Sequence, residues 1–291
     1  MSAVIARKKK LTDRKKLKIL QGRLHGLGSV AVAFSGGVDS SFLLWYSLQT
    51  LGKENVLAVT ASSETYPRAE RDSAIEFARK IGARHLVINT SELSVKNFAE
   101  NPIDRCYYCK RELFEKLKKI AKKNDINAVA DGTNADDRRD IRFGTKAAKE
   151  LGVRSPLAEA GIGKETIRRA LKKARISVWK KASFACLASR FPFGENIDGV
   201  TLKRIDLSET FLRDIGLRQL RVRVHGKNVA RIEVEKYGFR KVLDKKEEIL
   251  KRFRKIGFDF VALDLEGYRT GSMNRPILRF IDRRSMLTKR R

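Results

Sequence analysis

The sequence has only three cysteines, Cys106, Cys109 and Cys186, in 291 residues. This small and odd number excludes the disulfide framework that is typical of small secreted domains. No apolar stretch approaches the roughly 20 residues that cross a bilayer, which excludes a membrane span. The basic N-terminal stretch has no apolar core followed by a small-residue cleavage site, so we expect no secretory signal and a cytoplasmic protein.

Acidic residues are also scarce, because 64 Lys and Arg face 34 Asp and Glu, which gives a net charge of +30. Such a field attracts nucleic acids, nucleotides and phosphorylated substrates. A lysine-rich solvated surface, common in proteins of hot or salt-adapted cells, explains the same charge. We find no added RNA-binding module and no aromatic-rich stacking face, so charge alone does not establish nucleic-acid binding.

The chain has no internal repeat and no low-complexity segment apart from its basic ends. In its N-terminal two-thirds, short apolar runs alternate with helical patterns. These runs predict strands at 28–34, 55–61 and 84–90, a fourth strand from residue 127, and helices at 40–52, 67–82 and 106–124. The alternation is typical of an α/β fold, a doubly wound parallel sheet with helices on both faces.

The pattern changes after about residue 185. Residues 219–226 and 228–234 alternate polar and apolar side chains, as in a half-exposed antiparallel hairpin. A predicted helix at 245–257 and a predicted strand at 258–267 follow. We therefore predict a basic N-terminal segment at 1–23, a first domain at 24–185, and a smaller C-terminal α+β domain at 186–291 that ends in a basic tail.

The string FSGGVDSS, residues 34–41, joins the first predicted strand to the first predicted helix. Its glycines let backbone N–H groups approach an anion at a helix N-terminus, where the helix dipole favours negative charge. The hydroxyls of Ser35, Ser40 and Ser41 add donors, and Asp39 is placed to hold Mg²⁺. The loop lacks the lysine of the G-x-x-x-x-G-K-[ST] motif, which argues against γ-phosphate transfer. It suits cleavage of ATP to AMP and pyrophosphate.

Two more polar stretches follow predicted strands, SSETY at 62–66 and DGTNADD at 131–137. We expect them to reach the same pocket as the loop, because ligands bind beyond the carboxyl ends of parallel strands. The string SGGVDSS resembles the signature of the PP-loop ATP pyrophosphatases, and this resemblance implies an adenine nucleotide alpha hydrolase-like fold. The ATP-binding residues that it implies are Ser35, Gly36, Gly37, Val38, Asp39, Ser40, Ser41, Ala61, Gly132 and Asn134. A plain Asp/Asn-rich turn is the alternative for residues 132–137.

Four further strings extend the resemblance over nearly the whole chain: RCYYCKRELF, SPLAEAGIGKETIRRAL, ACLASRFPFGENI and LEGYRTGSMN. Together they are similar to the LarE type of sulfur transferase, which acts in the biosynthesis of the nickel-pincer nucleotide. The resemblance implies that ATP adenylates a carboxylate of a pyridinium dicarboxylate mononucleotide, and that sulfur then replaces AMP to give a thiocarboxylate. It also implies a homo-oligomer.

Members of the LarE type come in two chemical kinds. One sacrifices a single cysteine, at the position that matches Cys186, and the other holds a [4Fe-4S] cluster on three cysteines and delivers sulfide from it. All three cysteines are present here, which favours the cluster kind, because thiolates are the soft ligands that clusters need. The i, i+3 spacing puts Cys106 and Cys109 on one side of a helix start. The predicted catalytic residues are Cys186, Cys106, Cys109 and Asp39, whereas the source of sulfide is unknown.

Arg221 and Arg223 fall on the same face of a predicted strand. By resemblance they hold the phosphate or carboxylate of the substrate, with Arg269 as a further candidate, because guanidinium groups bind such anions through two hydrogen bonds. An exposed polar strand face is the alternative. Glu209 matches, by resemblance, a metal-binding carboxylate. The three histidines show no ligand spacing, so we expect them to be structural.

Other interpretations of these patterns stay open. Cys106 and Cys109 also fit a structural zinc half-site or a redox pair, and all three cysteines fit inert buried positions. Related PP-loop enzymes with three-cysteine clusters thiolate tRNA, which would suit the positive charge. A basic nucleic-acid-binding protein with a decayed nucleotide fold and an amide-forming PP-loop enzyme are further alternatives.

Overall fold

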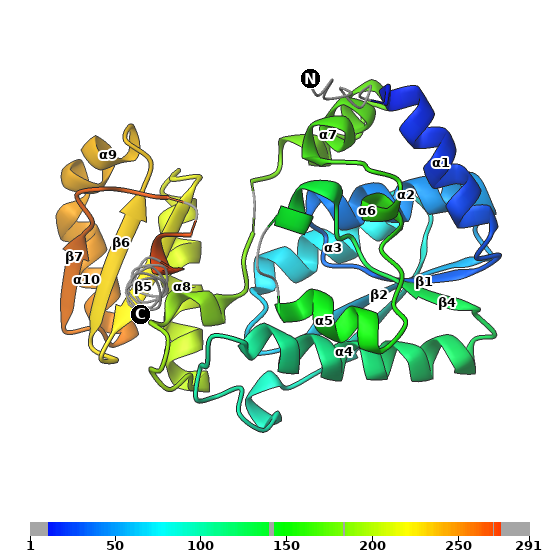
Figure 1. Ribbon diagram of the computed structural model, residues 1–291. Coiled ribbons are helices and arrows are strands. Elements are labelled where there is room, and N and C mark those ends of the chain that lie inside the picture. Colours follow the sequence, from blue (N-terminus) through cyan, green and yellow to red (C-terminus); the bar gives the residue numbers. More distant parts are fainter. Residues whose placement is uncertain (1–10, 140–142, 183, 270, 275–291) are drawn as a thin grey trace, which may run out of the picture. The chain divides into compact units, whose positions relative to one another are not determined.

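The computed structural model describes residues 11–139, 143–182, 184–269 and 271–274, which form two compact units (Figure 1). The first, here called the sheet unit, comprises residues up to Ser62 together with Glu70–Asn89 and Lys110–Ser183. The second, the hairpin unit, comprises Ser63–Ala69, Thr90–Cys109 and the residues from Phe184. Because the units interleave along the sequence, the boundary predicted at residue 185 stays a prediction. None of the described helices has the length and apolarity of a membrane-spanning segment.

The sheet unit contains a parallel four-stranded sheet in the order β3-β2-β1-β4, which confirms the predicted fold class. Its strands are β1 (Val30–Ala33), β2 (Val56–Ser62), β3 (Arg84–Asn89) and β4 (Ala128–Ala130). Val30 of β1 aligns with Val56 of β2 on one side and with Ala128 of β4 on the other. All four strands therefore run in the same direction, and the loops at their carboxyl ends lie along one edge of the sheet.

Helices cover both faces of this sheet (Figure 1). Val30 and Val32 belong to one core, whereas Ala31 belongs to a second core with Phe114 and Leu117. This division follows from the two-residue period of a strand, which sends successive side chains to opposite faces. The helices are α1 (Asp13–His25), α2 (Val38–Leu51), α3 (Arg68–Lys80), α4 (Arg105–Lys123), α5 (Phe143–Glu150), α6 (Pro156–Glu159) and α7 (Lys164–Lys173).

Part of the predicted basic N-terminal segment is a packed helix. The hydroxyl of Thr12 accepts the N–H of Lys15 and caps α1, which buries Leu20 and Leu24 in the core of the sheet unit. Tyr46 also donates a hydrogen bond to the Leu17 carbonyl at 3.1 Å. The basic residues between 13 and 25 are thus on a helix that is anchored by its apolar side. Residues 1–10 and the basic tail from residue 275 lie outside the described residues.

The hairpin unit holds a second, three-stranded sheet in the order β5-β6-β7. Strands β5 (Leu220–His225) and β6 (Val229–Val234) form the predicted antiparallel hairpin, and β7 (Phe260–Leu263) pairs parallel to β6. The helices of this unit are α8 (Gly199–Asp214), α9 (Gly238–Asp244) and α10 (Lys246–Ile256). Short 3₁₀ helices complete the chain at η1 (Glu92–Ser94), η2 (Ala135–Arg139), η3 (Ser177–Lys180), η4 (Leu187–Arg190) and η5 (Ser272–Asn274).

One expectation about the hairpin is wrong, because β5 is not half-exposed. Val222 and Val224 lie in the core of the hairpin unit, while Arg221 and Arg223 on the other face are only 6% and 5% exposed. Alternation of charged and apolar residues normally indicates one wet face. Here the charged face is covered, and buried arginines require partners that the strand's own sequence does not contain.

Candidate active site

The FSGGVDSS string forms a tight loop between β1 and α2. Gly36 has a φ of 61°, in the left-handed region that favours glycine. Ser40 holds the loop from within, because its hydroxyl accepts the Ser35 N–H at 3.3 Å and donates to the Gly37 carbonyl at 3.2 Å. Gly37 is the N-cap residue of α2, and no side chain caps this helix. An uncapped helix start after a glycine turn suits an anion.

Two glycines let the loop pack closely against its neighbours. A Cβ atom on Gly36 would lie 2.8 Å from the Cβ of Ala74 in α3. A Cβ atom on Gly132, just after β4, would lie 2.9 Å from the backbone nitrogen of Ser40. Both distances are shorter than van der Waals contact, so neither position has room for a side chain. Gly132 thereby brings the DGTNADD stretch to the start of α2.

Asp39 meets this second stretch through hydrogen bonds. The Asn134 side chain donates to Asp39 at 3.1 Å, and the Asn134 N–H donates to Asp137 at 3.2 Å. Burial and the nearby Asp137 charge raise the pKa of Asp39, while the Asn134 hydrogen bond and the charges of Lys164 and Arg168 act in the opposite direction. A buried carboxylate beside a second carboxylate favours a bound cation, which would relieve both the burial and the repulsion.

Mg²⁺ fits this pair of carboxylates better than a metal held by protein ligands alone. No three His, Cys, Asp or Glu side chains gather as a metal site within the described residues. Mg²⁺ in nucleotide sites usually takes one or two carboxylates and completes its shell with phosphate oxygens and water. Asp39 is therefore suited to hold Mg²⁺ only together with a nucleotide.

Not all residues predicted for the ATP site lie on an open surface. Ser41 is fully buried in the apolar side of α2, so its hydroxyl has no open surface. Thr60, next to the predicted ATP residue Ala61, is 1% exposed. Its hydroxyl donates to the Phe34 carbonyl and forms a hydrogen bond with His85, both at 2.8 Å. Ala61 is half-buried near the end of β2. Most of the SSETY stretch belongs to the hairpin unit, because this unit includes residues Ser63–Ala69.

Three cations that sequence reasoning missed lie around the loop. Lys164, at the start of α7, is 3.9 Å from Asp137, and the charges of Lys164 and Arg168 act on Asp39. Lys181 donates to the Gly36 carbonyl at 3.0 Å. The loop itself contains no lysine, but the fold supplies positive charge from residues 164–181. The strings GKETIRR and WKK contain these residues, yet no spacing rule connects them to a loop more than a hundred residues away.

All three cysteines belong to the hairpin unit. Cys106 is exposed, while Cys109 and Cys186 are half-buried and pack against the core of that unit. Burial raises the pKa of the Cys186 thiol, the charge of Cys106 raises it further, and the charges of Arg105 and Arg190 oppose both effects. Cys106 is therefore close enough to act on the pKa of Cys186, although the two residues lie far apart in sequence.

Arg190 fixes the backbone that carries Cys186. Its side chain is 0% exposed and donates to the carbonyl oxygens of Ala185 and Cys186 at 2.7 and 3.1 Å. The same guanidinium group binds both carboxylate oxygens of Glu209, at 2.7 and 2.9 Å. Sequence analysis did not single out Arg190. A fully buried arginine cannot be recognised from local pattern, because arginine is usually a surface residue.

Glu209 is the centre of an ion-pair cluster. Besides Arg190, it accepts from Arg213 at 2.8 Å and from the Val222 N–H at 3.1 Å. Burial alone would raise the pKa of Glu209, but the charge and hydrogen bonds of Arg190, with the charges of Arg213 and Arg221, lower it to about 2. These bonds occupy both carboxylate oxygens, so a metal ion would have to displace a guanidinium group. We therefore assign Glu209 to the support of Arg190.

The predicted substrate arginines differ in how they are held. Arg223 pairs with buried Glu233 at 3.0 Å and donates to the Ser189 carbonyl at 2.8 Å. Arg221 donates to the Leu220 carbonyl and lies 5.1 Å from the centre of the Tyr268 ring, and burial and the charge of Arg190 lower its pKa. Arg269 is partly exposed and pairs with Glu266. Two arginines on one strand face are thus buried, and Arg223 is paired with a buried carboxylate.

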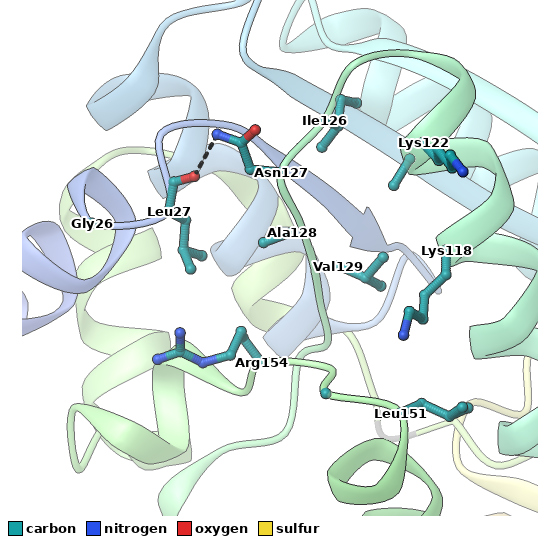
Figure 2. A pocket seen from close by; sticks show the side chains of 12 residues that line it. Gly26, Leu27, Lys118, Lys122, Ile126, Asn127, Ala128, Val129, Leu151 and Arg154 are labelled. Carbon is teal, nitrogen blue, oxygen red and sulfur yellow. Dashed lines mark hydrogen bonds between the residues drawn. The ribbon is translucent and has the colours of Figure 1, made fainter.

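The sheet unit also contains a cavity of about 590 Å³ (Figure 2). Its lining includes Lys118, Lys122, Asn127 and Arg154, and Asn127 donates to the Leu27 carbonyl at 3.2 Å. Residues 126–129, at the amino end of β4, also line it. Ligands of parallel sheets bind at the opposite, carboxyl end of the strands. None of the residues predicted for catalysis, ATP or substrate lines this cavity.

The sequence of this chain is similar to a family profile and to several known proteins. The NAD synthase family profile matches residues 15–153. The chain is 35% identical, over 88% of its own length and 92% of its relative, to the pyridinium-3,5-bisthiocarboxylic acid mononucleotide synthase of Lactiplantibacillus plantarum. It is 39% identical to an uncharacterized protein of Synechocystis sp., over 89% of this chain and 97% of that one. An uncharacterized protein of Methanocaldococcus jannaschii is 34% identical over 83% and 91% of the two chains.

Proposed function

The chain belongs to the LarE-type family of the pyridinium-3,5-bisthiocarboxylic acid mononucleotide synthase, and on this basis we propose that it is an ATP-dependent sulfur transferase. Its substrate is a pyridinium dicarboxylate mononucleotide. A substrate carboxylate oxygen attacks the α-phosphorus of ATP and releases pyrophosphate. A sulfur nucleophile then attacks the acyl carbon, AMP leaves, and a thiocarboxylate is formed.

The loop in the sheet unit supports the first of these steps. It combines an uncapped start of α2, a glycine turn and Asp39 beside Asp137. Backbone N–H groups at such a helix start bind phosphate, and Asp39 holds Mg²⁺ against it. Lys164 and Arg168 add positive charge where the negative charge of the leaving pyrophosphate develops.

The hairpin unit supports the second step. The observation that carries the proposal is that Cys106, Cys109 and Cys186 fall in one compact unit, with Arg190 holding the Cys186 carbonyl. Three soft thiolates are the ligand set of a [4Fe-4S] cluster, and Cys106, Cys109 and Cys186 would hold it. Within the described residues these three side chains do not gather as a metal site, so they would have to move together to bind the cluster. Such a cluster, held by Cys106, Cys109 and Cys186, would supply sulfide as the sulfur nucleophile. Arg190 keeps the Cys186 backbone in place, and Arg105 counteracts the effect of burial on this thiol.

Arg221 and Arg223 orient the substrate in this proposal. Both are buried on one face of β5, and Arg223 is held in place by Glu233. A prepositioned guanidinium group binds phosphate or carboxylate with little loss of side-chain entropy. The phosphate of the mononucleotide supplies the anion that they bind.

The test is anaerobic purification and reconstitution, followed by measurement of iron, of pyrophosphate released from ATP, and of thiocarboxylate product. Separate Cys106→Ala, Cys109→Ala and Cys186→Ala variants should each lose iron and product. The matched control is Tyr108→Phe, which changes the same turn of α4 without removing a thiol and should keep both.

Three results would contradict this proposal in different ways. Loss of product in the Cys186→Ala variant alone, without iron in any preparation, would indicate a sacrificial Cys186. Release of orthophosphate instead of pyrophosphate would exclude adenylation. Thiolation of tRNA, with no reaction of the mononucleotide, would show that the sulfur acceptor is RNA.

A further inference from the structure

Lys181 contacts three groups within the sheet unit. Its ammonium group donates to the Gly36 carbonyl at 3.0 Å and to the Ser73 hydroxyl at 3.1 Å, and pairs with Glu70 at 2.8 Å. The side chains of Lys181 and Glu70 are each 19% exposed. Lysine is rarely this buried without partners, because removing its charge from water is costly. These partners satisfy the ammonium group at the base of the FSGGVDSS loop.

The hydrogen bond from Lys181 to the Gly36 carbonyl determines the orientation of the peptide group between Gly36 and Gly37. A peptide unit is planar and trans, so the carbonyl of Gly36 and the N–H of Gly37 point in opposite directions. Lys181 draws the Gly36 carbonyl toward itself and thus directs the Gly37 N–H away from itself. No acceptor within the described residues takes this N–H. Gly37 is also the N-cap of α2, where an incoming phosphate would lie.

Without this hydrogen bond, the backbone of Gly36 could adopt several conformations. Its φ of 61° is available to glycine at little cost, and so are several other conformations. A charge-assisted hydrogen bond to its carbonyl selects one of them. The Cβ of Ala74 limits the loop from the other side, because it lies 2.8 Å from where a Gly36 side chain would begin.

We propose that Lys181 is a positioning residue for nucleotide binding, which orients the Gly36–Gly37 peptide so that its N–H faces the ATP phosphates. The lysine of the common phosphate loop contacts the phosphate directly, and the FSGGVDSS loop lacks it. Lys181 would instead hold the loop backbone that contacts the phosphate. This inference rests on the proposed function, since it concerns the site where ATP binds. The alternative is a structural ion pair in which Lys181 only neutralises Glu70 of α3.

The experiment compares binding of α,β-methylene-ATP with Mg²⁺ and binding of adenosine, both measured by calorimetry. Lys181→Met should bind the ATP analogue about tenfold more weakly, the effect of one lost charge-assisted hydrogen bond. Its affinity for adenosine should not change, because adenosine has no phosphate. Glu70→Gln removes the ion pair but keeps the lysine, and should stay within about threefold of the wild type. Lys180→Met, an exposed neighbour, is the matched control and should bind like the wild type.

Three outcomes would overturn the inference: unchanged affinity of Lys181→Met for the ATP analogue, equal loss of ATP analogue and adenosine, or an equal effect of Glu70→Gln and Lys181→Met. If Lys181→Met does not fold, Lys181→Arg carries the test. It keeps the charge but moves the donor, so it should weaken binding of the ATP analogue and spare adenosine, and wild-type affinity would overturn the inference.

The proposed function can fail independently. If the wild-type protein binds the analogue but makes no thiocarboxylate, only the proposed sulfur transfer is contradicted, and the comparison of variants still decides the role of Lys181. If the wild-type protein does not bind the analogue, both proposals are wrong.

Discussion

Arg190 donates two hydrogen bonds to Glu209, one to each carboxylate oxygen, at 2.7 and 2.9 Å, and neither side chain is exposed to solvent. The remaining nitrogen of the same guanidinium group holds the carbonyl oxygens of Ala185 and Cys186. A buried carboxylate on α8 thus determines where the backbone of Cys186 lies. Stability of the hairpin unit and the position of this cysteine depend on the same pair.

Glu209→Gln should lower the free energy of unfolding by about 3 kcal/mol at neutral pH, because it leaves the buried charge of Arg190 without its partner. The folded pKa of Glu209 is about 2, below its ordinary value of 4.5. The stabilisation is therefore fully present above pH 4.5 and is lost as the pH falls toward 2. Denaturant unfolding at several pH values measures both effects.

The control for this variant is Glu248→Gln, which removes an exposed pair with Lys245. It should change stability by less than about 1 kcal/mol, as is usual for surface pairs. Equal stability of Glu209→Gln and the wild type at neutral pH would contradict the assigned role of the Arg190–Glu209 pair.

Asp39→Asn should abolish Mg²⁺-dependent ATP cleavage and at the same time raise the melting temperature. Burial and the charge of Asp137 raise the pKa of Asp39, so its ionised form opposes folding at neutral pH. In the wild type, Mg²⁺-ATP binding should weaken as the pH falls through this raised pKa, at a higher pH than an ordinary aspartate would give. Binding titrations across pH and thermal melts test this; a less stable Asn variant would refute the electrostatic argument.

Gly132→Ala should weaken ATP binding about tenfold or more, because its Cβ would lie 2.9 Å from the Ser40 nitrogen and push the two loops apart. Gly22→Ala is the control, since a Cβ there meets no atom within 4 Å. As a helix-interior change it should stabilise the protein by about 0.5–1 kcal/mol and leave ATP binding intact. Calorimetric titration distinguishes them, and an ATP affinity of Gly132→Ala equal to that of Gly22→Ala would show that the close approach is unimportant.

Arg221→Met should raise the KM for the mononucleotide by about tenfold to a hundredfold and leave the KM for ATP unchanged, because a lost guanidinium–anion pair contributes a few kcal/mol. Arg223→Met should have the same effect on substrate and should also reduce stability, since it removes one of the two arginines that pair with buried Glu233. Steady-state kinetics with each substrate varied in turn provides the measurement. Equal changes in both KM values would indicate a general structural defect.

Much of the fold followed from local patterns. The alternation of apolar runs and helical spacing predicted the parallel sheet, and the two-residue alternation of polar and apolar side chains predicted the hairpin. These features depend on residues that are near in sequence, where periodicity and turn chemistry are informative. The FSGGVDSS loop was found for the same reason, since all its parts lie within eight consecutive residues.

What surrounds the site was decided by the tertiary structure. In sequence, Arg221 and Arg223 resemble a solvent-exposed strand face, yet both are buried. Arg223 pairs with Glu233 and the Ser189 carbonyl, and Arg221 lies against the Tyr268 ring. Lys181 and Lys164 lie in ordinary basic strings, whereas Arg190 lies in a mainly apolar one. The roles of all three depend on partners elsewhere in the chain. The sequence by itself determined the loop, the three thiols and the two sheets, through short-range pattern and residue chemistry. Only folding determined which charges are buried together, because the energy of a buried charge depends on long-range contacts that no local pattern records.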